Sequence, residues 1–76
     1  MADHSYKHLC DLLVDARRKA VLTQAEVSLR LKRPQSFVSK YERGERRLDL
    51  LEFGQVARAI GIDPVRFLRK LYEEVS

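Results

Sequence analysis

Hydrogen-bonding side chains are concentrated between residues 35 and 43, and this short segment carries the clearest chemical signal in the chain. Its polar members are Gln35, Ser36, Ser39, Lys40 and Arg43. The apolar Val38 and Tyr41 recur between them at helical spacing and would face inward. Glutamine, lysine and serine are side chains that hydrogen-bond to base edges in the major groove of DNA. An ordinary solvated helix carries the same residue types, so the surrounding elements must decide between the two readings.

Those elements predict two short helices joined by a tight turn, over about residues 23–43. Thr23 and Glu26 have the spacing of a capping box, which starts the first of the pair. Pro34 follows the end of that helix and suits the first turn of the second. Gly44 then allows the left-handed conformation that ends it. Such a pair forms a rigid corner whose second helix presents its outer face.

The rest of the chain also has helical periodicity, and no segment alternates like a strand. A helix from about Ser5 to Lys19, with Ser5 as its cap, is expected first. The fourth helix starts at Asp49, in a capping box with Glu52, and ends at Gly61; the fifth opens at Asp63-Pro64. The inward residues expected on the fourth helix are Leu50, Phe53, Val56, Ala57 and Ile60. We therefore predict an all-α fold: a compact five-helix bundle in a single domain spanning residues 1–76.

Composition narrows the function classes. The chain has 76 residues, of which 45% are hydrophobic and 34% charged, with a formal net charge of +4. Residues 21–48 contain seven basic and three acidic side chains, so the excess lies in the middle third. This favours a polyanionic partner, although a solvated surface would show a similar bias. A deep catalytic cleft is hard to build at this length, so an enzyme is not expected.

Several other classes find no support. The one cysteine excludes an internal disulfide and suggests a cytoplasmic protein, and no apolar run is long enough for a membrane span. His4, His8 and Cys10 are too few for a metal site, and no second cluster follows them. Neither a nucleophile motif nor a phosphate-binding glycine loop is present. No metal and no cofactor are therefore expected.

The sequence resembles the phage-repressor-like (Cro/repressor, XRE-type) helix-turn-helix regulators of bacteria and phages. The resemblance covers roughly residues 9–71. It rests on Arg17, on Leu22 to Val27, on Gln35 to Gly44 and on Ala59 to Asp63. It implies a lambda-repressor-like DNA-binding domain that regulates transcription. Two positions depart from the family pattern: Lys32 replaces a glycine at the end of the second helix, and Pro34 replaces a serine or threonine cap.

The resemblance also implies roles for individual residues. The positions expected to read bases are Gln35, Ser36, Ser39 and Lys40. Those expected to contact the DNA backbone are Gln24, Phe37, Arg43, Arg46 and Arg47, although Phe37 could instead pack against the second helix. Arg17 and Glu42 match a structural ion pair between the first and third helices.

One copy of the domain reads too little sequence, because each base contact supplies only about 1–3 kcal/mol of discrimination. We therefore expect a homodimer on a palindromic operator, acting as a repressor or autoregulator. The expected dimer surface, on the helices of residues 49–75, is Val65, Phe67, Leu68, Leu71 and Tyr72; the alternative is that these residues only close the monomer core. The sequence is also compatible with a protein partner, such as a toxin or the polymerase. The alternative functions are therefore an antitoxin-like protein-interaction module and a restriction–modification controller.

Overall fold

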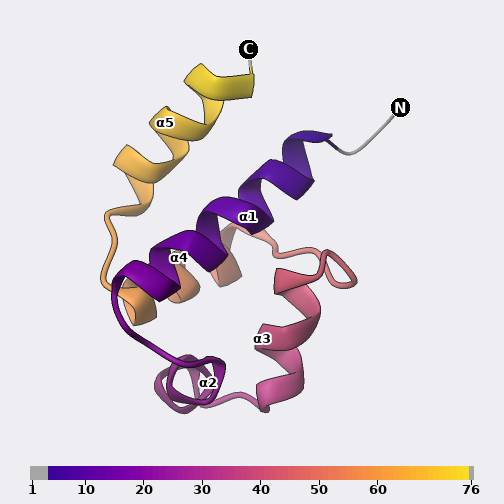
Figure 1. The fold of residues 1–76 in the computed structure, drawn as a ribbon, viewed down its shortest axis with the longest axis vertical. Helices are drawn as coiled ribbons and strands as arrows, with labels where there is room; N and C mark the ends of the chain where they lie inside the picture. The colour runs from indigo at the N-terminus through magenta and orange to yellow at the C-terminus, as the bar shows by residue number, and fades with distance from the viewer. Residues whose placement is uncertain (1–3, 76) are drawn as a thin grey trace.

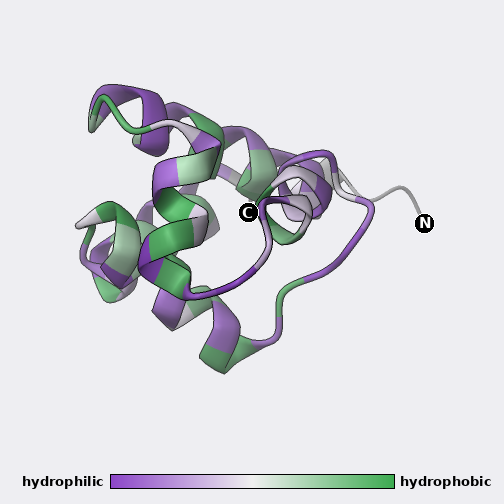
Figure 2. Cartoon of the chain, turned by 90° about the horizontal axis from the view of Figure 1, so that it is seen from below, coloured by the Kyte–Doolittle hydropathy of each residue, from purple (hydrophilic) through white to green (hydrophobic). Residues whose placement is uncertain are grey.

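The computed structural model describes residues 4–75, which form five helices and no strand (Figure 1). They are α1 (His4–Lys19), α2 (Gln24–Leu31), α3 (Gln35–Glu42), α4 (Leu50–Ile60) and α5 (Pro64–Val75). α2 packs against α3 and α4, while α1 packs against α3 and α5. Each helix carries both hydrophobic and hydrophilic residues (Figure 2), as amphipathic helices around one small core do. The all-α prediction is confirmed.

Both capping boxes expected from the sequence are present. The hydroxyl of Thr23 accepts the N–H of Glu26, and the carboxylate of Glu26 accepts the N–H of Thr23. Asp49 and Glu52 make the same reciprocal pair at the start of α4. The Ser5 cap was wrong, because α1 begins at His4 and Ser5 already lies in its first turn.

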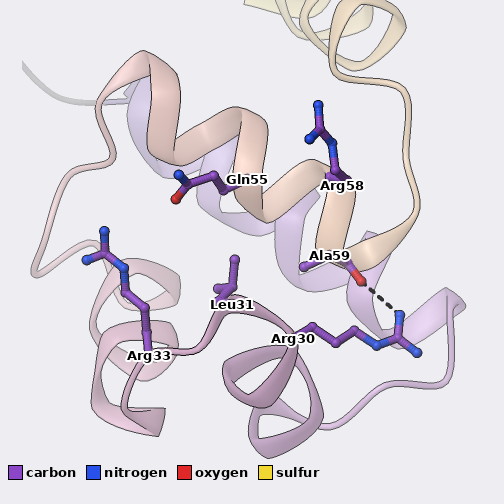
Figure 3. Close-up of a pocket in the computed structure, with 6 residues that line it drawn as sticks. All are labelled: Arg30, Leu31, Arg33, Gln55, Arg58 and Ala59. Atoms are coloured by element: carbon purple, nitrogen blue, oxygen red, sulfur yellow. Dashed lines mark hydrogen bonds between the residues drawn. The ribbon is translucent and has the colours of Figure 1, made fainter.

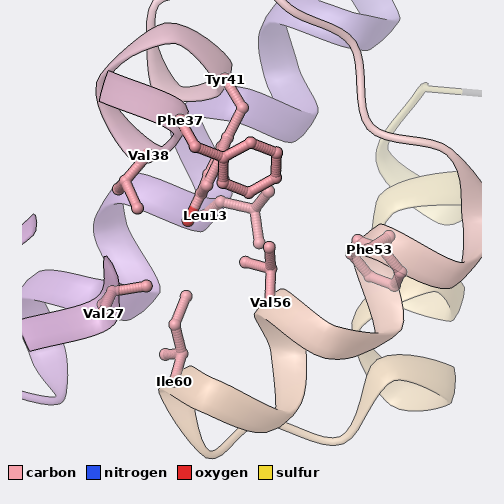
Figure 4. Close-up of a cluster of buried hydrophobic side chains, with 8 residues drawn as sticks. All are labelled: Leu13, Val27, Phe37, Val38, Tyr41, Phe53, Val56 and Ile60. Carbon is pink, nitrogen blue, oxygen red and sulfur yellow. The ribbon is translucent and has the colours of Figure 1, made fainter. Parts of the chain in front are cut away.

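The core lies where α1, α2, α3 and α4 meet (Figure 4). Its fully buried side chains are Leu13, Val27, Val38, Tyr41 and Val56, joined by Phe37, Phe53 and Ile60. Leu50 was expected to face this core, but it is 76% exposed at the first position of α4. Burial of α3 through Val38 and Tyr41 leaves the opposite face of this helix uncovered.

The first four helices are each followed by a residue in the left-handed conformation, and at α3 and α4 this residue is a glycine. Gly44 closes α3 in this way at no steric cost, but Val21 and Lys32 adopt φ of 59° and 58° after α1 and α2. At both positions the N–H of the left-handed residue and the N–H of the residue after it donate to carbonyls of the last turn, the Schellman pattern. Lys32, where the resembling family has glycine, therefore keeps the same turn geometry at the cost of backbone strain.

Relieving this strain at Val21 is expected to stabilise the protein. A left-handed residue with a Cβ costs about 1–2 kcal/mol, and Val21 is 86% exposed, so glycine loses little packing there. Glycine also has more conformational freedom in the unfolded chain, which offsets part of this gain. Val21→Gly should therefore raise the free energy of unfolding by about 0.5–1 kcal/mol. The midpoint of thermal unfolding should rise by a few degrees.

The control is Ala20→Gly at the neighbouring exposed position, which has no positive φ. There glycine has no strain to relieve, so this change should lower the melting temperature. Equal shifts for the two variants would contradict a strained turn at Val21.

Candidate nucleic-acid interface

The outer face of α3 presents the polar group that the sequence singled out. Gln35, Ser36 and Lys40 are exposed, Ser39 is half-buried, and Arg43 is exposed just past the helix end. Pro34 caps the helix without a side-chain hydrogen bond, so no side chain neutralises the positive end of its dipole. A row of hydrogen-bonding side chains next to an open helix N-terminus is a geometry suited to a DNA groove and its phosphates.

An ion pair holds α3 at a fixed angle to α1. Nε of Arg17 lies 2.7 Å from Oε2 of Glu42, and the two side chains are only 11% and 5% exposed. A second guanidinium nitrogen donates to the other carboxylate oxygen at 3.2 Å, and a bond to the carbonyl of Leu22 ties in the loop before α2. The hydrogen bond to Glu42 raises the pKa of Arg17 further. The pair therefore acts as a structural clamp behind the exposed face.

Gln24, expected to bind a phosphate, joins the same clamp. Its amide nitrogen donates to Oε1 of Glu42 at 2.9 Å, so the first residue of α2 is tied to the end of α3. The side chain is half-buried. In this arrangement Gln24 orients α2 and α3 relative to one another.

The assignment of Phe37 to the DNA backbone is corrected by its burial. The ring is only 7% exposed and meets Tyr41 edge-on, with 5.6 Å between ring centroids. The guanidinium groups of Arg33 and Arg46 lie 4.5 and 4.8 Å from the ring centroid. Phe37 is thus a core residue that supports two arginines.

The loop between α3 and α4 is held by contacts that the sequence did not reveal. The hydroxyl of Tyr6, on α1, accepts the N–H of Leu48 and donates to the carbonyl of Arg46. The guanidinium of Arg47 stacks on the ring of Tyr6, 4.4 Å from its centroid. These bonds join positions 40 and 42 residues apart. No local pattern could have predicted them.

The two other arginines of this region have carboxylate partners. Arg43 pairs with Glu45 on the exposed surface at 3.0 Å. Arg46 makes two hydrogen bonds, of 3.0 and 2.8 Å, to Glu52 at the start of α4. Arg33 also approaches Glu52, at 3.5 Å. Arg46 is therefore committed to a structural bond, whereas Arg43 can exchange its exposed partner for another anion.

Glu52 makes the stability of the protein sensitive to acid. Its hydrogen bonds from Arg46 and from the N–H of Asp49 lower its pKa to about 2. A carboxylate with a lowered folded-state pKa stabilises the fold above its unfolded pKa of about 4.5, and this contribution is lost as the pH falls towards 2. Urea unfolding should show Glu52→Gln less stable than the parent at neutral pH, with the difference shrinking below about pH 4.5. A difference that is constant with pH would contradict the assignment.

On α5 the structure divides the predicted dimer residues into two groups. Leu71 is only 7% exposed and Phe67 packs on Phe53, so these two close the monomer core; their assignment to the dimer surface is corrected. Val65 and Tyr72 are 64% and 67% exposed. A shallow apolar hollow is lined by Val65, Leu68, Arg69, Tyr72 and Glu73.

The other features named from the sequence have structural roles or fall outside the description. Cys10 is buried, its Sγ bonds to the carbonyl of Tyr41, and burial raises its pKa. His8 pairs with Glu74. The side chain of His4 lies outside the described part of the chain. Across residues 4–75, none of the helices is long and apolar enough to cross a membrane.

Comparison with known proteins agrees with this geometry. Residues 13–67 match the helix-turn-helix family. An XRE-family like protein from Pseudomonas syringae pv. tomato str. DC3000 has a solved structure 50% identical in sequence, with a TM-score of 0.94; the match covers 97% of this chain and 90% of that one. A mutant of the restriction-modification controller protein C.Esp1396I is 19% identical, with a TM-score of 0.86 over 99% of this chain and 95% of that one, a likeness of fold alone. The comparison with curated proteins gives no significant match.

The chain belongs to the helix-turn-helix family, as an XRE-type member. Its function is that of a DNA-binding transcription regulator, and it is not an enzyme. In this fold α2 and α3 are the helix-turn-helix.

Proposed function

We propose that this protein represses transcription, its own gene included, by binding as a homodimer to a palindromic operator. The observation that carries the proposal is the exposed set Gln35, Ser36 and Lys40 on an α3 whose apolar face is buried. With the half-buried Ser39, these side chains read base edges. The regulator acts in the cytoplasm by occupying its operator and excluding polymerase.

Backbone contacts supply the sequence-independent part of the affinity. Arg43 and Arg47 contact phosphates directly, and the positive end of α3 adds to their attraction. Gln24 and Arg46, also proposed at the backbone, reach a phosphate while their carboxylate partners hold them in place. Each neutralised phosphate should contribute about −0.9 to the slope of log K against log salt concentration.

The test is a selection of binding sites from random duplexes with the purified protein. The expected result is an enriched motif made of two inverted half-sites, with centres roughly 34 Å apart, one turn of the double helix. A motif without inverted symmetry would exclude the dimeric arrangement. No enrichment at all would exclude sequence-specific binding.

The dimer surface proposed is the exposed apolar part of α5. Val65, Leu68 and Tyr72 line one side of the helix, with Arg69 and Glu73 beside them. In a two-fold interface the same patch meets its copy, so the apolar residues would bury one another. Large exposed apolar side chains grouped in this way favour association.

A charge placed in this surface should separate the protomers. Tyr72→Glu would bury a carboxylate in the interface without affecting the monomer core, since Tyr72 is 67% exposed. Sedimentation should show the parent as a dimer and Tyr72→Glu as a monomer, with unchanged helical content. The control is Arg66→Glu, at an exposed position of α5 outside the hollow. A parent that sediments as a monomer at high micromolar concentration would contradict the proposed interface.

A further inference from the structure

A positively charged hollow lies between the end of α2, the turn after it, and α4 (Figure 3). Its volume is about 590 Å³, and it is lined by Arg30, Leu31, Arg33, Gln55, Arg58 and Ala59. In Figure 3 the side chain of Leu31 points towards α4. Arg33 and Arg30 lie on either side of Leu31, and the side chain of Arg58 extends from α4 away from Leu31. No acidic residue lines it. The hollow therefore combines an apolar floor with a cationic rim.

The charges of this rim are poorly compensated. Arg30 donates to the carbonyl oxygen of Ala59 at 2.8 Å, an acceptor without net charge. Arg33 lies 3.5 Å from Glu52, but that carboxylate is bound more closely by Arg46, at 2.8 Å. Within residues 4–75, Arg58 has no hydrogen-bond or ion-pair partner. Three arginines in one hollow repel one another, and an anionic ligand would remove this repulsion.

An exposed leucine extends the surface beyond the arginines. Leu51 is 79% exposed and precedes Gln55 by one helical turn, so both lie on the same face of α4. Phosphates need cations but gain nothing from leucines. Arginine combined with exposed apolar side chains is typical of surfaces that bind proteins.

A second copy of this chain is poorly suited as the occupant. Every described aspartate and glutamate already interacts within its own chain: Asp11, Asp15, Glu26, Glu42, Glu45, Asp49, Glu52, Asp63, Glu73 and Glu74. To bind the hollow of another copy, any of these carboxylates would first have to break its present interaction. The carboxylates that bind the hollow should therefore belong to a different protein.

We propose that this surface, the α2–α4 hollow with Leu51, binds an acidic segment of a different protein that also carries leucine-like side chains. Carboxylates of the segment pair with Arg30, Arg33 and Arg58, and its apolar side chains cover Leu31 and Leu51. The proposal does not depend on DNA binding, because these residues lie outside the base-reading set. It assigns the regulator a second surface, for a protein partner.

The test uses a short synthetic peptide of repeated Glu-Glu-Leu units, blocked at both ends, and the full-length protein. Two matched peptides replace either the glutamates with glutamines or the leucines with serines. Addition of the first peptide should shift the backbone amide signals of Leu31 and Ala59 in a two-dimensional NMR spectrum. Each matched peptide should bind about tenfold more weakly, because it lacks either the charges or the apolar contact.

The variant is Arg30→Ala/Arg58→Ala, and the control is Arg66→Ala/Lys70→Ala, which removes the same charge from exposed positions of α5 outside the hollow of that helix. Peptide affinity should fall about tenfold in the first and stay within about twofold in the second. Thermal melts of both variants verify that the fold is intact.

Three results would overturn the proposal. The first is no shift at Leu31 and Ala59 with the Glu-Glu-Leu peptide. The second is equal binding of the glutamine or serine peptide. The third concerns DNA: a duplex shifts these same amide signals, and Arg30→Ala/Arg58→Ala lowers the slope of log K for DNA binding against log salt concentration by about two. That result would assign the hollow to phosphates.

Discussion

Replacing Arg17 with methionine is expected to lower the free energy of unfolding by about 3–5 kcal/mol, the largest single effect foreseen in this protein. Methionine fills much of the same volume but leaves the carboxylate of Glu42, whose side chain is 5% exposed, without its cation. The bond to the carbonyl of Leu22 is lost as well. Urea unfolding at neutral pH, followed by circular dichroism, measures the change as a lower midpoint.

The next residue supplies a matched control. Arg18 is exposed, so Arg18→Met removes the same charge without breaking a buried ion pair. It should change the free energy of unfolding by less than about 0.5 kcal/mol. The double variant Arg17→Met/Glu42→Leu removes both charges together and should recover most of the loss, since no charge is then left unpaired. A double variant as unstable as Arg17→Met would show that packing, and not the stranded carboxylate, dominates.

Removing two base-reading side chains should abolish most of the sequence specificity. Gln35→Ala and Lys40→Ala are each expected to cost about 1–3 kcal/mol of discrimination, so the double variant should bind the selected operator about a hundredfold or more less tightly. Both side chains are exposed, so the fold should survive. Fluorescence anisotropy with labelled operator and with an unrelated duplex measures the specific and the non-specific affinity.

The comparison between the operator and the unrelated duplex shows whether these side chains contribute to specificity. Non-specific affinity should fall only slightly, because phosphate contacts remain. Lys70→Ala, an exposed lysine on α5, loses the same charge as Lys40→Ala and should leave operator discrimination unchanged. Operator affinity unaffected by Gln35→Ala and Lys40→Ala would refute the assignment of α3 as the reading helix.

Much of the fold was predictable because its signals are local. A capping box needs only four consecutive residues, and the Thr23–Glu26 and Asp49–Glu52 boxes both form as the spacing indicates. Val38 and Tyr41 recur at the helical period and are both fully buried. The outward face of α3 follows directly, since a helix buried on one side exposes the other.

The contacts that tune the site were not predictable, because they join residues far apart in sequence. No local pattern shows that Arg46 is bound to Glu52. None shows that the ring of Phe37 is buried beneath two guanidinium groups. On α5, the apolar pattern named the right helix but could not separate the buried Leu71 from the exposed Tyr72.

The amino-acid sequence alone determined that this protein is a bundle of amphipathic helices with a polar outer face on residues 35–43. Caps, glycines and apolar periods act within a few residues, and their free energies are largely local. Only the tertiary structure decided which charges are paired and which apolar side chains remain exposed. Those outcomes depend on which helices meet, and the α2–α4 hollow exists only because Arg30, Arg33 and Arg58 are brought together by that packing.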